Sequence, residues 1–245
     1  MKYPTLREEK KLWKRGFEVV VGLDEVGRGA LGGPVIVAAV SINSRFQTPT
    51  HKKIPNSKHQ VPNKKFWLLE NGNLFGIWNL EFGNLKIRDS KKLTPKQREK
   101  LYKLITQSSF IKWGIGKVSE KVIDKINIFE ATKLAMKRAI QNLSDKLKNE
   151  NRRINFLILD GNFSIDVSIP QKSIVKADEK ILSCAMASII AKVVRDRIME
   201  KYAKKFPEYG FEKHKGYGTK FHLEMLKKYG PCKIHRKSFM PIAKI

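Results

Sequence analysis

An apolar run that ends in two acids constrains the fold of this chain more than any other feature. Residues 19–23 read Val-Val-Val-Gly-Leu, a β-branched run typical of a buried strand. Asp24 and Glu25 follow directly, and Gly27, Arg28 and Gly29 come next. Carboxylates at the end of a buried strand, in a strongly basic chain, favour a site for hard divalent metal ions that act on a polyanion.

The charge balance predicts a negatively charged partner. The 245 residues include 50 Lys and Arg against 23 Asp and Glu, which gives a formal net charge of +27. Nucleic acid is the leading candidate, an anionic membrane surface is second, and a general basic bias in composition is the alternative. Residues 1–15 lack a secretory apolar segment, and Cys184 and Cys232 form no metal-binding spacing. We therefore expect a cytoplasmic protein without membrane association.

Strands alternate with helices along the chain, which predicts the α/β class. We expect strands at residues 19–23, 35–40, 74–80, 85–87, 110–118, 153–160 and 173–175. We expect helices from Thr94-Pro95 onward and at residues 128–149, 178–201 and 219–228. The expected organisation is an N-terminal helix in residues 1–17, a catalytic domain in 18–200 with a basic insertion at about 44–84, and a helical C-terminal extension in 201–245.

Four acids fall where strands end or a helix begins. Asp160 ends a strand that is apolar throughout its core, and Asp178 opens a helix after a short strand. Because sites of α/β sheets gather at such ends, we expect Asp24, Glu25, Asp160 and Asp178 to converge. Mg²⁺ or Mn²⁺ can neutralise such a cluster, and a pair of ions can promote in-line displacement at a phosphodiester. Each acid also has a simpler reading: a solvated pair, an Asx turn or a helix cap.

Two further segments have the composition of a nucleic-acid site. In the helix after Asp178, Ser188, Lys192 and Arg195 share one face, so Lys192 is expected beside the acids or a phosphate, unless it only extends to solvent. Residues 209–219 combine aromatics, cations and glycines, which suits contact with a nucleic-acid strand or, alternatively, packing of aromatic anchors. Three histidines lack the spacing of zinc ligands, so we expect them to bind phosphate or to be solvated: His214, His222 and His235.

Ordered motifs over residues 18–240 give the chain a specific resemblance to bacterial ribonuclease HII. They are Gly-Leu-Asp-Glu-Val-Gly-Arg-Gly at 22–29, Gly-Pro-Val at 33–35, Asp-Ser-Lys-Lys-Leu at 89–93, residues 128–140, Leu-Asp-Gly at 159–161, Ala-Ser-Ile-Ile-Ala-Lys at 187–192 with Arg-Asp at 195–196, His-Lys-Gly-Tyr-Gly-Thr at 214–219 and His-Arg-Lys-Ser-Phe at 235–239. A single motif of this kind would be weak, but this many in order leave little room for chance.

The resemblance implies an RNase H-like fold with a central mixed five-stranded sheet flanked by helices. It implies Mg²⁺- or Mn²⁺-dependent endonucleolysis of the RNA strand of RNA–DNA hybrids, and incision 5′ of single ribonucleotides in duplex DNA, leaving a 3′-hydroxyl and a 5′-phosphate. A monomer active in ribonucleotide excision repair and DNA replication is expected. The catalytic and metal-binding residues carried over are Asp24, Glu25, Asp160 and Asp178. The substrate-binding residues carried over are Gly27, Arg28, Gly29, Lys91, Ser188, Lys192, Tyr217, His235 and Arg236.

The chain also departs from the family pattern. Ala177 stands where the family usually has glycine before the aspartate, and the basic segment at about 44–84 is longer than usual. That segment is expected either to contact the duplex backbone or to have no role in binding. The sister family ribonuclease HIII shares the acids but usually lacks the arginine, so Arg28 and the short N-terminal segment disfavour it. A binding module without activity would be expected to lack an acid, whereas all four are present.

Overall fold

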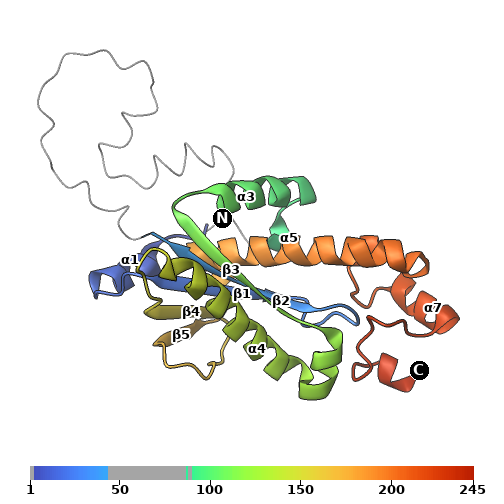
Figure 1. Ribbon diagram of the computed structural model, residues 1–245. Helices are drawn as coiled ribbons and strands as arrows, with labels where there is room; N and C mark the ends of the chain where they lie inside the picture. Colours follow the sequence, from blue (N-terminus) through green and yellow to red (C-terminus); the bar gives the residue numbers. More distant parts are fainter. Residues whose placement is uncertain (1–2, 44–86, 88–89) are drawn as a thin grey trace, which may run out of the picture.

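The computed structural model describes residues 3–43, 87 and 90–245, and within them a five-stranded mixed sheet forms the centre (Figure 1). The elements are α1 (Arg7–Lys14), β1 (Val20–Val26), β2 (Val35–Ile42), η3 (Ser90–Lys92), α3 (Pro95–Gln107), β3 (Ile111–Val118), α4 (Glu120–Lys148), β4 (Phe156–Asp160), β5 (Gln171–Ile174), η4 (Ala177–Glu179), α5 (Leu182–Lys205), η5 (Pro207–Tyr209), α6 (Phe211–His214), α7 (Lys220–Tyr229) and η6 (Ile242–Lys244). The predicted α/β class with a central mixed sheet is confirmed.

The strand order is β3-β2-β1-β4-β5. β1 pairs antiparallel with β2, which pairs antiparallel with β3, whereas β4 runs parallel to both β1 and β5. Leu23 is the register partner of Leu159. The following residues, Asp24 and Asp160, therefore lie side by side on neighbouring strands.

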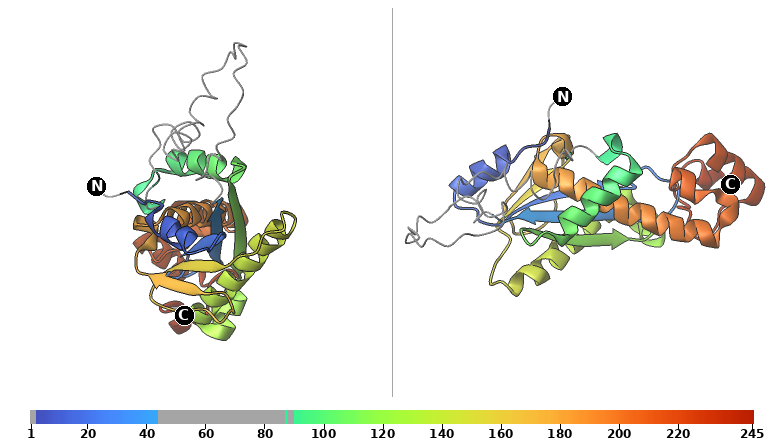
Figure 2. Two further views of the ribbon diagram at one scale, coloured as in Figure 1. Left: turned by 90° about the vertical axis from the view of Figure 1, so that its left-hand side faces the viewer. Right: turned by 90° about the horizontal axis from the view of Figure 1, so that it is seen from above.

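Period-two alternation in the strands divides the core into two layers. In β2, Val35, Val37 and Ala39 pack with the apolar side of α4, while the intervening side chains pack with α3 and α5. Figure 2 shows the same arrangement, with α4 on one side of the sheet and α3 and α5 on the other. All of β2 is buried, which explains why its sequence reads as a continuous apolar run.

Two glycines of β3 let the backbone of α4 approach the sheet. A Cβ added at Gly114 would lie 2.5 Å from the carbonyl oxygen of Ala139, and one added at Gly116 would overlap the carbonyl of Ala135. Small residues on α4 complete this close contact, since Ala131 and Ala135 are fully buried. Glycine in a strand interior is normally unfavourable, but at these two positions the absence of a side chain is what allows α4 to pack closely.

The helix expected at 128–149 begins earlier than predicted and is broken. α4 starts at Glu120, and Asn127 interrupts it with φ 64° and ψ 168°. The Asn127 side chain then accepts hydrogen bonds from the backbone N–H groups of Phe129 and Glu130, at 2.9 and 3.1 Å. Asn127 is thus the N-cap of the second helical segment, which is why the periodic pattern is recognisable only from residue 128.

The helix expected from Asp178 also begins later, so the interpretation of Asp178 as its cap is wrong. Asp178 lies in the 3₁₀ turn η4, and α5 starts at Leu182. Lys176 adopts a left-handed conformation, with φ 57°, immediately before this turn. The Ala177 N–H donates to Asp160 Oδ1 at 2.8 Å. The local chain is therefore shaped around the acids rather than as a helix start.

Glu9 of α1 provides the cap that α5 lacks in its own sequence. Its Oε1 accepts hydrogen bonds from the Ser183 N–H at 2.9 Å and from the Ser183 hydroxyl at 2.8 Å. Glu9 is 1% exposed, and burial raises its pKa to about 7. A carboxylate at a helix N-terminus also interacts favourably with the helix dipole, so α1 is tied to the start of α5.

Several other expectations concern local elements. The helix that starts at Thr94-Pro95 is confirmed, with a complete capping box between Thr94 and Gln97. Helical structure at 219–228 is confirmed as α7, with Thr219 as its N-cap. The strands expected at 74–80 and 85–87, apart from Ile87, and the basic insertion at about 44–84 lie outside the described residues. None of the described helices has the length and apolar character needed to cross a bilayer.

Gly116→Ala should destabilise the protein by about 2–3 kcal/mol, because the new methyl group overlaps the backbone of α4. For a chain of this size the melting temperature should fall by roughly 5–10 °C, measurable by thermal denaturation. Lys117→Ala, at the exposed neighbouring position of β3, is the control and should change it little. A melting temperature for Gly116→Ala equal to that of the parent would contradict the close packing.

Candidate functional site

Three of the four predicted acids converge near the carboxyl ends of strands β1 and β4. Asp24 of β1, Asp160 at the end of β4 and Asp178 of η4 each offer a carboxylate oxygen, and these oxygens all lie within 4.8 Å of one another. Asp24 is 6% exposed and Asp178 is 5% exposed. The parallel pairing of β1 with β4 brings the first two together, and the turn after β5 adds the third.

Glu25 lies next to this group but is held differently. Its Oε1 accepts a hydrogen bond from the Arg28 guanidinium at 3.3 Å, while its Oε2 is buried and has no hydrogen-bond partner among the described residues. Strand β1 continues to Val26, so Asp24 and Glu25 lie within the last three residues of the strand rather than after its end. Neighbouring strand residues point to opposite faces, which accounts for their different surroundings.

The electrostatics of the acids are unfavourable without a cation. Burial raises the pKa of Asp24 well above its ordinary 3.8, and the carboxylates of Glu25 and Asp160 raise it further, against a hydrogen bond with Ser188 that lowers it. Burial likewise raises the pKa of Glu25, and Arg28 opposes that shift. Carboxylates that repel one another in a buried place are typical of sites where charge is tuned for function.

These residues fit a divalent metal ion. Three aspartate oxygens within 4.8 Å of one another form an all-oxygen donor set. Mg²⁺ and Mn²⁺ prefer such ligands and complete their coordination with water or phosphate oxygens. A bound cation would also relieve the carboxylate repulsion, so the arrangement favours metal binding.

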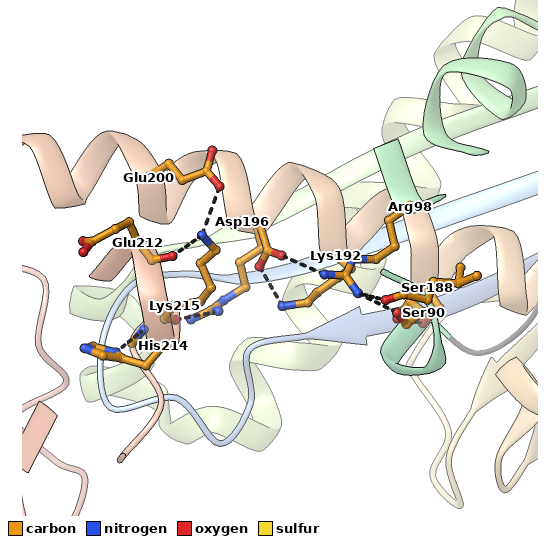
Figure 3. A network of polar contacts seen from close by, with 12 residues as sticks. Ser90, Arg98, Ser188, Lys192, Asp196, Glu200, Glu212, His214 and Lys215 are labelled. Carbon is orange, nitrogen blue, oxygen red and sulfur yellow. Dashed lines mark hydrogen bonds and ion pairs between the residues drawn. The ribbon is translucent and has the colours of Figure 1, made fainter. Parts of the chain in front are cut away.

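A polar network beside the acids joins the turn η3 to α3 and α5 (Figure 3). The Ser188 hydroxyl, next to Asp24, is hydrogen-bonded to the Ser90 hydroxyl at 2.9 Å. Arg98 of α3 donates to the Ser90 carbonyl at 2.9 Å, which fixes the turn η3. Lys91 is exposed on this turn. η3 is therefore held against α5 beside the acid cluster.

Lys192 is part of the same network one turn further along α5. Its ammonium group lies 2.7 Å from Asp196 Oδ1, and Arg98 lies 3.9 Å from the other oxygen of Asp196. Burial lowers the pKa of Lys192, while Asp196 opposes that shift. Lys192 thus lies on the expected face of the helix, one turn beyond Ser188, and is held in place by Asp196.

The Gly27-Arg28-Gly29 loop follows β1 directly. Arg28 lies between Glu25 and Phe163, whose ring centroid is 6.0 Å from the guanidinium carbon. Gly27 has φ 94°, and a Cβ there would collide with the Arg195 guanidinium, whereas a Cβ at Gly29 would meet no described atom within 4 Å. Glycine is therefore required by the protein's own packing at position 27, while the exposed position 29 is open toward solvent.

The expectation that the histidines are solvated or bind phosphate is wrong. His214, His222 and His235 are 9%, 0% and 2% exposed, and the first two rings stack with centroids 4.3 Å apart. The nitrogens Nε2 of His222 and His235 lie 3.0 Å apart. Nδ1 of His235 accepts the Cys232 N–H, and Nδ1 of His222 contacts the Tyr217 carbonyl at 2.9 Å. This chain of hydrogen bonds requires neutral rings.

Burial keeps those rings neutral, because it lowers the pKa of both His222 and His235 to about 4. The histidines form the apolar-aromatic core of the C-terminal extension together with Tyr209 and Phe211. Their spacing excludes a zinc-ligand pattern but gives no indication that the three rings pack together, because this depends on α6, α7 and the segment after α7 meeting in the fold. Tyr217 itself is half-buried, with the Arg195 guanidinium carbon 5.3 Å from its ring centroid.

His235 and Arg236, carried over as substrate-binding residues, are placed inside the protein. His235 is occupied by His222 and Cys232, and Arg236 is 0% exposed and bonded to backbone carbonyls that include those of Gly27 and Arg28. Both residues are therefore placed to support the Gly27-Arg28-Gly29 loop rather than to contact a substrate directly. Sequence reasoning did not assign a role to Phe163 or Arg195, although Arg195 lies on the helix face that carries Ser188.

Comparisons with known proteins show one family likeness over most of the chain. The family model described as Ribonuclease HII matches residues 78–242. The ribonuclease HII of Alkaliphilus metalliredigens is 38% identical over 235 residues, covering 96% of each chain. That of Caldicellulosiruptor bescii is 42% identical over 232 residues, covering 95% of this chain and 91% of its own.

Solved structures show the same fold at lower identity. The ribonuclease H2 of Pyrococcus horikoshii OT3 has a TM-score of 0.62 at 24% identity, covering 92% of this chain and 96% of its own. Bst-RNase HIII in complex with Mn²⁺ has a TM-score of 0.60 at 16% identity, covering 93% of this chain and 69% of its own. The RNase H-like fold implied by the motifs is confirmed.

Asp24→Asn should stabilise the metal-free protein more at high pH than at low pH. The folded-state pKa of Asp24 is raised above 3.8, so the folded chain binds more protons than the unfolded chain between the two pKa values. Stability therefore falls as the pH rises from 3.8 through the folded-state pKa. Asparagine has no proton to lose. Measured by thermal denaturation in chelator, the gain in melting temperature should grow as the pH rises above the ordinary pKa of 3.8 through the raised pKa of the folded state.

Added Mg²⁺ should raise the melting temperature of the parent more than that of Asp24→Asn, because binding to the folded state stabilises it. A gain that is constant across the pH range, together with equal metal responses of the two proteins, would contradict this account of the acid cluster.

Proposed function

The chain belongs to the ribonuclease HII family of endoribonucleases, and from this premise we propose that it cleaves the RNA strand of RNA–DNA hybrids and cuts 5′ of single ribonucleotides embedded in duplex DNA. The products are a 3′-hydroxyl and a 5′-phosphate. The observation that supports this most is the group of three aspartate oxygens within 4.8 Å of one another.

Asp24, Glu25, Asp160 and Asp178 would hold two divalent ions, Mg²⁺ or Mn²⁺. Bound there, the ions would supply charge neutralisation at the leaving oxygen and activation of the attacking water. The protein's part is to fix the carboxylates before substrate arrives. The Ala177 N–H holds Asp160, Ser188 contacts Asp24, and Arg28 orients Glu25. Preorganised charge of this kind is the main source of stabilisation in phosphoryl-transfer sites.

The substrate lies along the loop and the neighbouring turn in this proposal. Gly27, Arg28 and Gly29 read the 2′-hydroxyl of a ribonucleotide, which distinguishes RNA from DNA at one position. The open space at Gly29 supports this, because no described atom would obstruct a side chain there. Tyr217 stacks on the neighbouring deoxyribose. Lys91, Ser188 and Lys192 face the phosphates from the α5 side, while His235 and Arg236 support the loop and Tyr217 from within.

Nucleic acid is the expected partner throughout. The net charge of +27 supplies the sequence-independent attraction to a duplex. A monomeric, cytoplasmic enzyme of ribonucleotide repair and DNA replication is consistent with these properties. Residues 18–200 would form the catalytic domain and 201–245 the substrate-binding extension.

Asp24→Asn should reduce cleavage by roughly 1000-fold or more, because it removes charge that stabilises the transition state rather than groups that dock the duplex. Affinity for an RNA–DNA hybrid, measured by fluorescence anisotropy with the same preparation, should stay within about threefold of the parent. Cleavage by the variant near the parental rate would refute the assignment of Asp24. Hybrid binding without any cleavage by the parent in Mg²⁺ would favour a binding module instead.

Arg28→Ala and Tyr217→Ala should impair cleavage of a duplex with one ribonucleotide about 10-fold more than cleavage of a long RNA–DNA hybrid. The first change removes a charge-assisted hydrogen bond worth about 1.5–3 kcal/mol, and the second removes the ring that stacks on the neighbouring deoxyribose. A long hybrid offers many equivalent ribonucleotides, so its cleavage depends less on placing one particular ribonucleotide against the loop. The ratio of kcat/KM for the two substrates measures the effect, with Lys117→Ala as the control. Equal losses on both substrates would remove the ribonucleotide-reading role.

A further inference from the structure

Two arginines that are distant in sequence meet beneath the loop at residues 27–34. Arg195 of α5 and Arg236 near the C-terminus are each 0% exposed. Together they donate seven hydrogen bonds, and every acceptor is a backbone carbonyl. Within the described residues neither guanidinium has a carboxylate within ion-pair distance.

The acceptors belong almost entirely to the loop. Arg236 donates to the carbonyls of Gly27 at 2.7 Å, of Arg28 at 2.8 Å and of Gly33 at 2.9 and 3.1 Å. Arg195 donates to the carbonyls of Gly32 and Pro34, both at 3.0 Å, and to that of Lys215 at 2.9 Å. The last contact connects the loop to the segment before Tyr217, and Arg195 also packs directly under Gly27.

These contacts determine which way the loop's amides point. In a trans peptide the C=O and the following N–H lie on opposite sides, so a carbonyl held inward leaves its N–H directed outward. The Gly27 and Arg28 carbonyls point to Arg236, and the N–H groups of Arg28 and Gly29 therefore point away from it. Neither N–H has a hydrogen-bond acceptor within the part of the chain described. Successive outward N–H groups are suited to binding an oxygen of an anion or a hydroxyl.

The arrangement is costly for folding alone. Two like charges are buried together, and burial with the nearby Arg195 lowers the pKa of Arg236 to about 9. Neighbouring groups that favour the charge are Tyr217, Asp124, Glu120 and Asp196, none of which bonds either guanidinium. Removing charges from water without paired carboxylates is unfavourable. An anionic strand on the outer side of the loop would offset that cost.

We propose that Arg195 and Arg236 are positioning residues that hold residues 27–34 in the conformation that reads a single ribonucleotide. They do not touch the substrate in this account. They fix the direction of the Arg28 and Gly29 N–H groups and couple the loop to the segment of Tyr217. The inference rests on the proposed function, because it assumes that the loop reads the ribonucleotide.

Arg236→Lys and Arg195→Lys test the proposal, because lysine keeps the positive charge but lacks the planar fork that spans several carbonyls. Arg197→Lys, on the exposed side of α5 against Glu99, is the matched control. The readouts are kcat/KM for a duplex with one ribonucleotide and for a long RNA–DNA hybrid, and the melting temperature. Both buried variants should lose about 10-fold or more of their preference for the single ribonucleotide, and Arg197→Lys should keep it.

Gly29→Ala is measured in parallel, because it adds a methyl group in the open space where the substrate would lie without meeting any described atom of the protein. If it leaves the ratio of the two substrates unchanged, the proposed ribonucleotide reading fails rather than the positioning role. If Gly29→Ala alters the ratio but folded Arg236→Lys and Arg195→Lys do not, the positioning role is overturned. Failure of both lysine variants to fold would also overturn it, since the pair would then serve the stability of the fold rather than the setting of the loop.

Discussion

The mutual repulsion of buried carboxylates is the constraint on which the rest of this structure depends. Asp24, Asp160 and Asp178 offer oxygens within 4.8 Å of one another in a place largely closed to water. The surrounding fold holds such a group together, and either a bound cation or protonation of a carboxylate relieves the repulsion. The parallel pairing of β1 with β4 and the shape of η4, where Ala177 is bound to Asp160, supply that support.

Helix α5 connects the acid cluster with every other part of the site. Small residues at its start let it pack against Gly22 of β1, and Glu9 of α1 caps its N-terminus. Successive turns then present Ser188 to Asp24, Lys192 to Asp196 and Arg195 to the loop at 27–34. One rigid element thus sets the acid cluster, Lys192 and the loop at 27–34 relative to one another, which is how precise sites are commonly built.

The features predicted from the sequence are those that local patterns determine. Apolar runs gave the strands, and acids at their ends gave the convergence of Asp24, Asp160 and Asp178, because parallel strands end at one edge. The start of α5 was misplaced because its cap, Glu9, comes from a distant helix. The break at Asn127 is not predictable from the pattern, because a single residue with positive φ leaves no periodic signal. The histidine core and the two buried arginines depend on tertiary meetings that spacing alone does not encode.

Joint binding of divalent ions by the aspartates is tested most directly by a crystal of the protein grown with Mn²⁺ and measured at the manganese absorption edge. The expected result is anomalous density within ligating distance of Asp24, Asp160 and Asp178, with Glu25 beside it. Density only at other sites, or none at all under conditions that support cleavage of an RNA–DNA hybrid, would contradict the claim.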